Sequence, residues 1–302
     1  MSKSTKWFLG ILAVLVIIGG GFTLFAVSLT SFGSRATETY VSGSGDKIAV
    51  VELMGVIASS EDFVRQVKKY REDRSIKALL IRIDSPGGGV VPSQEMYEEL
   101  KKTREAGKPI VVSMGSLAAS GGYYVACGAS RLVANRGTLT GSIGVISEFL
   151  QFRDAMDKLG IDVKTVKSGK LKDAGSPTRK MTEDDQRYFQ NLIDDVHRQF
   201  IGVVEDERGL DSATAVSLAD GRVFTGEQAV GEGLVDTIGT YEDAISIAAD
   251  LAGISGSPSL VRERKKVSFW NNMFGDVGEA VKDLKQEVLQ RPMLSYRYKG
   301  PF

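Results

Sequence analysis

The sequence predicts an α/β fold in which helices cover both faces of a parallel β-sheet. Residues 76–83 and 110–114 are almost continuously apolar, which is typical of strands buried on both sides. Between strands the apolar residues take helical spacing, and Phe63 and Val67 share one face of a predicted helix over 61–71. Because strands alternate with helices along the chain, we expect the strands to run parallel.

The other predicted elements follow the same alternation. A strand over 48–53 opens the folded part, and a helix begins at Pro92, a favourable first position for proline. A long helix begins at Thr182, where Asp185 is placed like the acid of a capping box. We also predict helices over 148–159, 241–252 and 277–289, strands over 132–134, 142–146 and 162–166, and a strand, turn and short helix within 220–239.

The composition is that of an ordinary globular protein and excludes several kinds of function. The 302 residues include 38 basic and 38 acidic side chains, so the basic stripe that nucleic-acid binding needs is absent and we expect no nucleic-acid partner. With one histidine, His197, and one cysteine, Cys127, the chain offers no cluster of metal ligands, and we expect no metal and no cofactor. Cys127 is expected to be a buried apolar residue and His197 to flank the long helix.

An uncharged apolar segment near the N-terminus predicts a membrane anchor. Residues 7–29 exceed the length of about 20 that spans a bilayer, whereas a cleavable signal peptide has a core of about 7 to 15. Lys3 and Lys6 favour a cytoplasmic N-terminus, which predicts a single-pass protein of the cytoplasmic membrane with an extracytoplasmic folded domain. The predicted organisation is a cytoplasmic N-terminus over 1–6, an anchor over 7–29, a flexible stalk over 30–46, a folded domain over 47–255 and a tail over 256–302.

Ser120 and a triple glycine are the first candidates for catalysis. Ser120 follows the strand over 110–114 in a segment that predicts a tight turn and the start of a helix, so one turn could supply a nucleophile and oxyanion donors. Alternatively, Ser120 only caps that helix. Residues 87–89 follow the strand over 76–83 and either turn the chain or direct N–H groups at an oxyanion. Both segments follow carboxyl ends of strands, where parallel sheets bind ligands, which favours a functional role for each.

A serine nucleophile requires a base, and the loop over 167–180 offers lysines. A lysine serves only when it is uncharged, so its pKa must fall from about 10.4 to near the working pH, which burial in an apolar pocket can achieve. Lys167, Lys170 and Lys172 lie in this loop, and each is otherwise a solvated surface charge. The composition of the loop does not choose among them.

Five motifs in one order resemble the bacterial SppA-type signal peptide peptidases, within the wider ClpP/crotonase superfamily. The resemblance covers residues 47–252 and implies a ClpP/crotonase-like fold of repeated ββα units. The motifs are Asp-Ser-Pro-Gly-Gly-Gly at 84–89, Met-Gly-Ser-Leu-Ala-Ala-Ser-Gly-Gly-Tyr-Tyr at 114–124, Leu-Thr-Gly-Ser-Ile-Gly-Val at 139–145, Lys-Ser-Gly-Lys-Leu-Lys-Asp at 167–173 and Asp-Gly-Arg-Val-Phe-Thr-Gly at 220–226.

The resemblance implies a serine endopeptidase with Ser120 as the nucleophile and Lys172 as the general base. Gly87 and Gly121 would donate their N–H groups to the oxyanion, and Ser142 would orient the lysine. The resemblance also implies that signal peptides left in the membrane, and other hydrophobic peptides, are the substrates. It implies a homo-oligomer, suspected to be an octamer, whose active sites can combine residues of two protomers.

Other functions stay open at this point. One is a membrane-bound protease of the same class that acts on another membrane protein, such as a stomatin-type partner. A second is a crotonase-like acyl-CoA enzyme, which would not need Ser120, and a third is an inactive scaffold. We also expect the tail around residues 293–298 to reach an active-site groove and compete with substrate.

Overall fold

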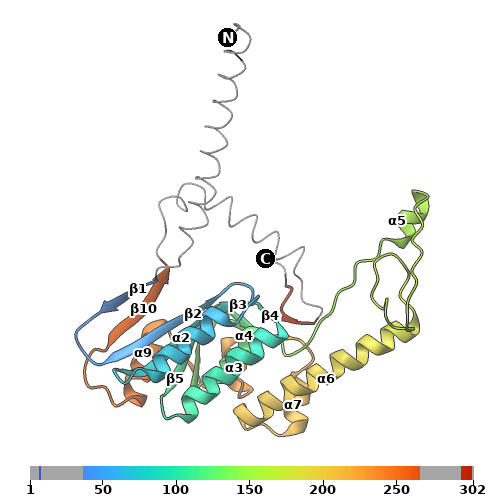
Figure 1. Ribbon diagram of the computed structural model, residues 1–302. Coiled ribbons are helices and arrows are strands. Elements are labelled where there is room, and N and C mark those ends of the chain that lie inside the picture. The colour runs from blue at the N-terminus through green and yellow to red at the C-terminus, as the bar shows by residue number, and fades with distance from the viewer. Residues whose placement is uncertain (1–6, 8–36, 266–293, 301–302) are drawn as a thin grey trace.

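A nine-stranded, mostly parallel sheet forms the centre of the computed structural model, which describes residues 7, 37–265 and 294–300 (Figure 1). Its main path runs β1 (Thr37–Ser42), β10 (Ser259–Lys265), β2 (Lys47–Met54), β3 (Ile76–Ser85), β5 (Ile110–Ala119), β6 (Arg131–Ala134) and β9 (Thr237–Ile238). β7 (Leu139–Gly141) pairs with the end of β5 and with β8 (Val223–Thr225). The pairs β1–β10 and β7–β8 are antiparallel and the others parallel, which confirms the predicted α/β class.

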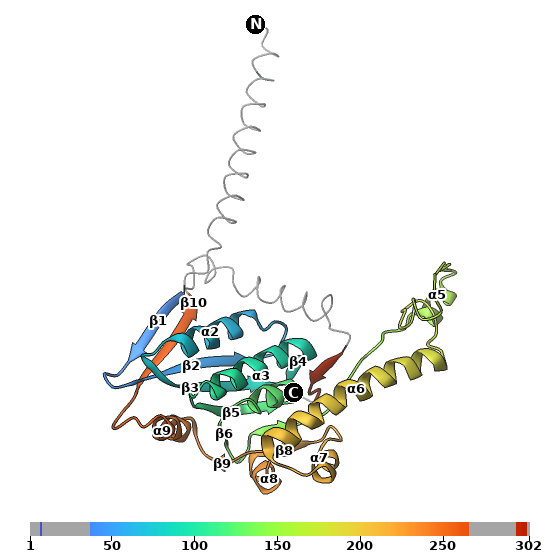
Figure 2. The ribbon, with the colours of Figure 1, turned by 60° about the horizontal axis from the view of Figure 1, so that its bottom comes forward.

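Helices cover both faces of this sheet. Helices α2 (Glu61–Glu72), α3 (Val90–Glu105) and α4 (Gly121–Ala126) pack on one face, and α9 (Tyr241–Leu251) packs on the other (Figures 1 and 2). Side chains of β3 alternate between the two cores: Leu79 and Ile81 join the first, whereas Ala78 and Leu80 join the second. The central residues of β3 are almost all apolar because both faces of the sheet are buried.

The long helix α6 (Glu183–Arg208) begins where the sequence predicts. Thr182 accepts from the N–H of Asp185, and the Asp185 carboxylate accepts from the N–H of Thr182, so the capping box is confirmed. His197 is half-buried on this helix, and Cys127 is buried at the end of α4. Burial raises the pKa of the Cys127 thiol to about 12, which leaves it an unreactive core residue. The helices α7 (Ser212–Leu218) and α8 (Gly226–Gly231) follow α6.

Parts of the predicted stalk and tail contribute strands, which the sequence analysis did not anticipate. β1 lies within 30–46 and β10 within 256–302, and all of β1 pairs with β10. The Thr-Glu-Thr-Tyr-Val run that opens β1 is rich in β-branched and aromatic residues, which suit a strand. β10 in turn pairs with β2, and its Val261 is buried in the core.

The N-terminal anchor cannot be followed in the described residues. Within residues 7, 37–265 and 294–300, no helix combines the length and apolar character that crossing a membrane requires. The segment 7–29 lies outside these residues except for Trp7, and the predicted helix over 277–289 lies outside them entirely. Both stay predictions.

Residues 147–182, which we call the arm, project from the body of the molecule (Figures 1 and 2). The helix predicted over 148–159 shortens to α5 (Arg153–Lys158), the strand over 162–166 does not form, and β7 replaces the strand predicted over 142–146. These predictions rested on apolar residues that were expected to be buried. The described chain does not cover them: Leu150 is 67% exposed, Leu159 73% and Val166 100%.

Candidate active site

Ser120 stands where strand β5 passes directly into helix α4. The tight turn predicted before Ser120 is wrong, because β5 continues to Ala119. Two contacts hold this extension: the Asp84 carboxylate accepts from the N–H groups of Ser116 and Leu117, at 3.3 and 3.2 Å. The neighbouring strand β7 adds the register pair Ala119–Gly141.

The backbone of Ser120 is strained. Its φ of 54° and ψ of −118° lie in a region that side chains rarely adopt, and its side chain makes no capping hydrogen bond, which rules out the helix-cap interpretation. Among described non-glycine residues, positive φ occurs at Ser120 and Ser142. The Ser120 N–H donates to Gly141 O at 2.7 Å, and its carbonyl accepts from the Tyr124 N–H at 2.8 Å. A strained serine between strand and helix is the geometry of a nucleophile elbow.

The strain predicts a stability difference between two inactive variants. Glycine adopts this backbone conformation at no steric cost, whereas alanine retains the strain of serine. The free energy of unfolding of Ser120→Gly is therefore expected to exceed that of Ser120→Ala by about 1 to 2 kcal/mol, and its Tm to be several degrees higher. Thermal denaturation of the two variants under one condition measures the difference, and equal Tm values would show that the turn is relaxed.

The glycines of β4 (Gly87–Gly89) form a short strand with a neighbour on each edge. On one edge, the Ile57 N–H donates to Gly87 O at 2.9 Å and the Gly89 N–H donates to Ile57 O at 2.8 Å. Because backbone groups alternate along a strand, the N–H and carbonyl of Gly88 point to the other edge. The Gly87 N–H donates to Ser85 Oγ at 3.1 Å, so the structure directs it away from the predicted oxyanion role.

The other edge of β4 is paired with β11 (Ser295–Arg297), close to Ser120. The register opposes Tyr296 to Gly88. A Cβ added to Gly87 would lie 2.1 Å from Tyr296 O and 2.5 Å from Gly121 N, and one added to Gly121 would lie 3.1 Å from both Gly88 N and Tyr296 O. A peptide carbonyl therefore lies among the glycines beside the serine. The tail was expected to reach this groove, but Gly88, whose N–H faces this carbonyl, was not among the predicted site residues.

Ser142 also belongs to this cluster. Its φ is 50°, it is buried, and its N–H donates to Arg222 O at 2.8 Å. The residue before it, Gly141, accepts from the Ser120 N–H, so the two strained serines are neighbours. The structure thus brings together Ser120, Gly87, Gly121 and Ser142 at the carboxyl ends of β3 and β5.

Lys172 is not brought to this cluster within one chain. It is exposed on the arm, in a segment that is fixed to the start of α6. There Asp173 accepts from Arg179 at 2.9 Å, and Arg179 also donates to Asp185 at 3.0 Å. α6 rises about 1.5 Å per residue, which places Asp185 roughly 17 Å from Val196, whose carbonyl accepts from the hydroxyl of Tyr296 in the tail. Figure 1 shows the arm directed away from α4.

The ionic network around Lys172 stays charged at working pH. Hydrogen bonds from Arg179 and then Lys167 lower the pKa of Asp173 to about 2, and Arg179 also lowers the pKa of Asp185. The stabilising charge of each carboxylate is therefore present above its ordinary pKa of about 4 and is lost only as the pH falls through the lowered value. The segment that carries Lys172 stays tied to α6 in neutral and alkaline solution.

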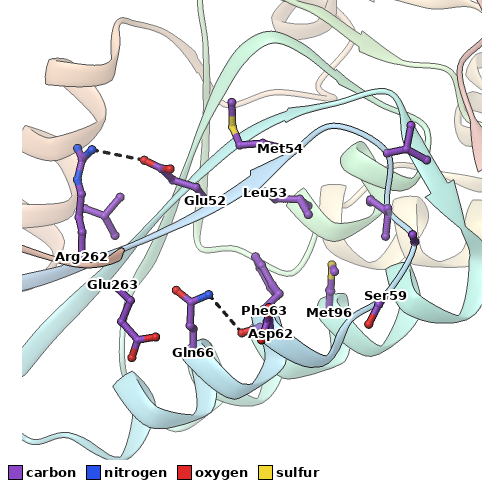
Figure 3. A pocket seen from close by; sticks show the side chains of 14 residues that line it. Glu52, Leu53, Met54, Ser59, Asp62, Phe63, Gln66, Met96, Arg262 and Glu263 are labelled. Carbon is purple, nitrogen blue, oxygen red and sulfur yellow. Dashed lines mark hydrogen bonds and ion pairs between the residues drawn. The ribbon is translucent and has the colours of Figure 1, made fainter. Parts of the chain in front are cut away.

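A separate cavity of about 470 Å³ lies between β2, α2 and β10 (Figure 3). Glu52 and Arg262 pair at 3.4 Å on its wall, and Glu263 and Phe63 also line it. Neither Ser120 nor any glycine of β4 lines this cavity. It is therefore separate from the cluster around Ser120.

A strained serine beside a glycine strand that pairs with an extended peptide is an arrangement that a serine peptidase requires. Comparison with known proteins agrees with this class. Residues 102–255 match peptidase family S49. A Synechocystis protein named as a protease is 46% identical over 209 residues, which cover 69% of this chain and 75% of that protein. A protein of Enterococcus faecium named as a signal peptide peptidase SppA is 37% identical over 239 residues, 74% of this chain and 70% of that protein.

The chain belongs to peptidase family S49 and is a serine peptidase. The resemblance to the SppA-type peptidases is thereby confirmed, and the acyl-CoA alternative is set aside. Protease 4 of Salmonella typhi is 36% identical over 243 residues, 76% of this chain and 39% of that protein. The solved structure of a ClpP1 point mutant from Listeria monocytogenes aligns with a TM-score of 0.45 and 15% identity, over 65% of this chain and 93% of that chain.

Proposed function

We propose that this peptidase is a membrane-anchored endopeptidase in which Ser120 is the nucleophile and Lys172 of a second copy of the chain is the general base. The observation that supports it most is β11, an extended peptide whose carbonyl at Tyr296 lies among Gly87, Gly88 and Gly121. A peptide substrate in the same register would present its carbonyl carbon to the serine.

The proposed reaction passes through an acyl-enzyme. The neutral amine of Lys172 takes the proton of Ser120 as Oγ attacks the peptide carbonyl, and the N–H groups of Gly88 and Gly121 stabilise the oxyanion. Lys172 then gives the proton to the leaving amine. The same lysine deprotonates a water molecule that attacks the ester, and it returns this proton to Ser120 Oγ as the bond between Oγ and the acyl carbon breaks. Ser142, next to Ser120, would hold the amine in place.

The arm supports a site shared between two copies of the chain. It carries Lys172 together with apolar side chains that the described chain leaves exposed, among them Leu150, Leu159 and Val166. Exposed apolar surface of this kind marks an interaction site. If the arm covered the groove of a neighbouring copy, these residues would be buried and the lysine would lose the water that keeps it charged. We therefore propose a homo-oligomer, with an octamer as the working assumption.

The proposed substrates are remnant signal peptides and other hydrophobic peptides. The predicted anchor over 7–29 would hold the peptidase domain at the outer face of the cytoplasmic membrane, where such remnants collect. The name of the Enterococcus faecium relative points to the same substrates. A synthetic signal peptide and a stomatin-tail peptide, offered to the full-length protein in detergent, would separate this assignment from a protease of other membrane proteins.

Covalent capture of Ser120 tests the proposed dyad. A fluorophosphonate probe is expected to label Ser120, identified by peptide mass spectrometry, at a rate that rises from pH 6 to pH 9 as the base loses its proton. Tyr124 and Tyr296, which lie near Ser120, do not contribute to this rise, because burial raises the pKa of Tyr124 to about 12 and also raises that of Tyr296. Labelling that declined steadily over this range would contradict a lysine base.

Matched lysine variants make the capture experiment specific. Lys172→Ala is expected to slow labelling at least about 100-fold, the lower range for general-base catalysis. Lys164→Ala removes an exposed lysine from the same arm, outside the motif, and is expected to label at the parent rate. Equal labelling of the two variants would remove Lys172 from the mechanism.

A further inference from the structure

The outer edge of strand β2 is open over residues 51–54, which we call the open edge. β10 pairs with the first four residues of β2, and no other strand of the described chain pairs with the rest of that side. On the inner side the Gly55 N–H donates to Asp84 O at 2.8 Å. Because backbone groups alternate along a strand, the N–H and carbonyl groups of Glu52 and Met54 point outward. Such an edge can pair with a further strand.

The cavity in Figure 3 lies along the open edge and gives it an apolar face and a polar face. On the side of α2 and α3 its wall includes Leu53, Phe63 and Met96, which are at most 6% exposed. Glu52 lies on the opposite face of the strand, where it pairs with Arg262 at 3.4 Å. A strand that fits this edge therefore needs β-branched or apolar side chains on one face and a basic side chain on the other.

One segment of the arm has this pattern and has no strand to pair with in its own chain. The strand predicted over 162–166 does not form, and the described chain is neither helix nor strand there. Val163 and Val166 are 42% and 100% exposed, and Lys164 has no acidic partner among the described residues. The run Val-Lys-Thr-Val is rich in β-branched residues, which favour strands. The chain thus holds both an unpaired strand-forming segment and an unpaired strand edge.

From these two features we propose that residues 163–166 of one copy add a strand to the open edge of β2 in the next copy, parallel to β2 and with Lys164 opposite Glu52. In this register Val163 and Thr165 face the apolar wall of the cavity, and the Lys164 amine approaches the Glu52 carboxylate. Exposed charges of this kind fix the register more than the strength of the contact. The proposal rests on the proposed shared active site and names the surface that receives the arm.

The parallel direction carries the rest of the arm toward Ser120. Neighbouring strands lie about 4.8 Å apart, so a strand beside β2 would lie three spacings, roughly 14 Å, from β5, which ends one residue before Ser120. Six residues lead from Val166 to Lys172, and an extended chain of that length reaches about 20 Å. A strand on the open edge can therefore bring Lys172 to the nucleophile of the neighbouring copy.

The arm and the open edge lie on opposite sides of the molecule. In both views the arm projects from one side, and β1 and β10, which flank the open edge, form the other (Figures 1 and 2). Contact between two such surfaces is head-to-tail, because each copy gives its arm to one neighbour and receives the arm of another. Head-to-tail contacts of one kind generate a ring when the rotation closes.

A disulfide across the proposed pair tests the contact. The full-length protein carrying Glu52→Cys and Lys164→Cys is oxidised in detergent and analysed on a non-reducing gel, while the native Cys127 is buried. We expect most chains to run as intermolecular species, since residues opposite each other on paired strands lie at a distance that a disulfide spans. The control combines Glu52→Cys with Lys158→Cys, an exposed lysine of α5, and should run as a monomer. Cross-linking that is absent from the first protein, or equal in both, would overturn the proposal.

Two proline variants separate strand pairing from contact between side chains. In the proposed register the N–H of Thr165 donates to the carbonyl of Glu52, whereas the N–H of Lys164 points to solvent. Thr165→Pro is therefore expected to slow labelling of Ser120 by the fluorophosphonate probe at least about 10-fold, because proline cannot donate this hydrogen bond. Lys164→Pro keeps every paired N–H and should label within about twofold of the parent rate. Equal labelling of the two variants would refute a paired strand.

Cross-linking in an inactive background distinguishes failure of this proposal from failure of the shared site. The disulfide does not require cleavage of peptides, so the gel experiment is repeated with Ser120→Ala added. If labelling of the intact serine proved independent of Lys172, cross-linked species in this background would still support the docking surface. Labelling that depends on Lys172, in a protein that forms no cross-link, would refute the docking surface and leave the shared site standing.

Discussion

Replacing Ser120 with alanine is expected to lower peptidase activity by about four orders of magnitude or more, as removal of the nucleophile does in other serine peptidases. The lost group is one oxygen atom, and alanine accepts the same backbone conformation at a similar cost, so the fold should persist. Steady-state cleavage of the synthetic signal peptide measures the loss, and the thermal denaturation curve should match that of the parent protein within a few degrees.

Ser116→Ala is the matched control for this substitution. Ser116 lies on the same strand, β5, and its side chain is exposed, so the same change in chemistry occurs away from the glycines. We expect it to retain parent activity. Residual turnover by Ser120→Ala above a tenth of the parent rate would remove the serine from the mechanism, whatever the control shows.

The second large effect is expected from Gly87→Ala. The added Cβ would lie 2.1 Å from the position of the bound peptide carbonyl and 2.5 Å from Gly121 N, and both atoms belong to backbone that cannot move aside cheaply. Peptide pairing along β4 and the oxyanion site would both be disturbed. We expect kcat/KM to fall at least about 100-fold, the cost of losing an oxyanion donor.

A control glycine separates this clash from the cost of the backbone conformation. Gly87 and Gly107 both have positive φ, 89° and 85°, but a Cβ on Gly107 would meet no atom within 4 Å. Alanine at either position costs about 1 to 2 kcal/mol in conformation, so both variants should lose a few degrees in Tm. Gly107→Ala is expected to retain kcat/KM within about twofold. Equal loss of activity in the two variants would show that stability, and not the site, is affected.

The central strands and the position of the nucleophile could be predicted from the sequence. The runs that became β3 and β5 are buried on both faces, so their apolar residues carried an unambiguous signal. Ser120 and Gly87 follow the carboxyl ends of these strands, and the topology of a parallel sheet brings those ends together. Local capping chemistry likewise fixed the start of α6 at Thr182.

The arm and the details of the site could not be predicted in this way. Leu150, Leu159 and Val166 suggested buried elements because they are apolar. A sequence pattern does not show whether other parts of the same chain cover such residues, and here the described residues do not. The direction of the Gly87 N–H depends on its hydrogen bond to Ser85 Oγ, which a run of three glycines does not predict. For this reason Gly87, and not Gly88, was predicted as the oxyanion donor. The tail was expected at the groove, but its register, with Tyr296 opposite Gly88, follows only from the pairing with β4.

Mixing two inactive variants tests most directly whether Ser120 works with Lys172 of another copy. Full-length Ser120→Ala and Lys172→Ala, co-expressed with different affinity tags and purified through both, form mixed assemblies in which some sites hold an intact serine and an intact lysine. Random assembly in a closed ring predicts activity of about one quarter of the parent value. Activity no higher than that of either variant alone, in assemblies shown to contain both chains, would contradict a shared site.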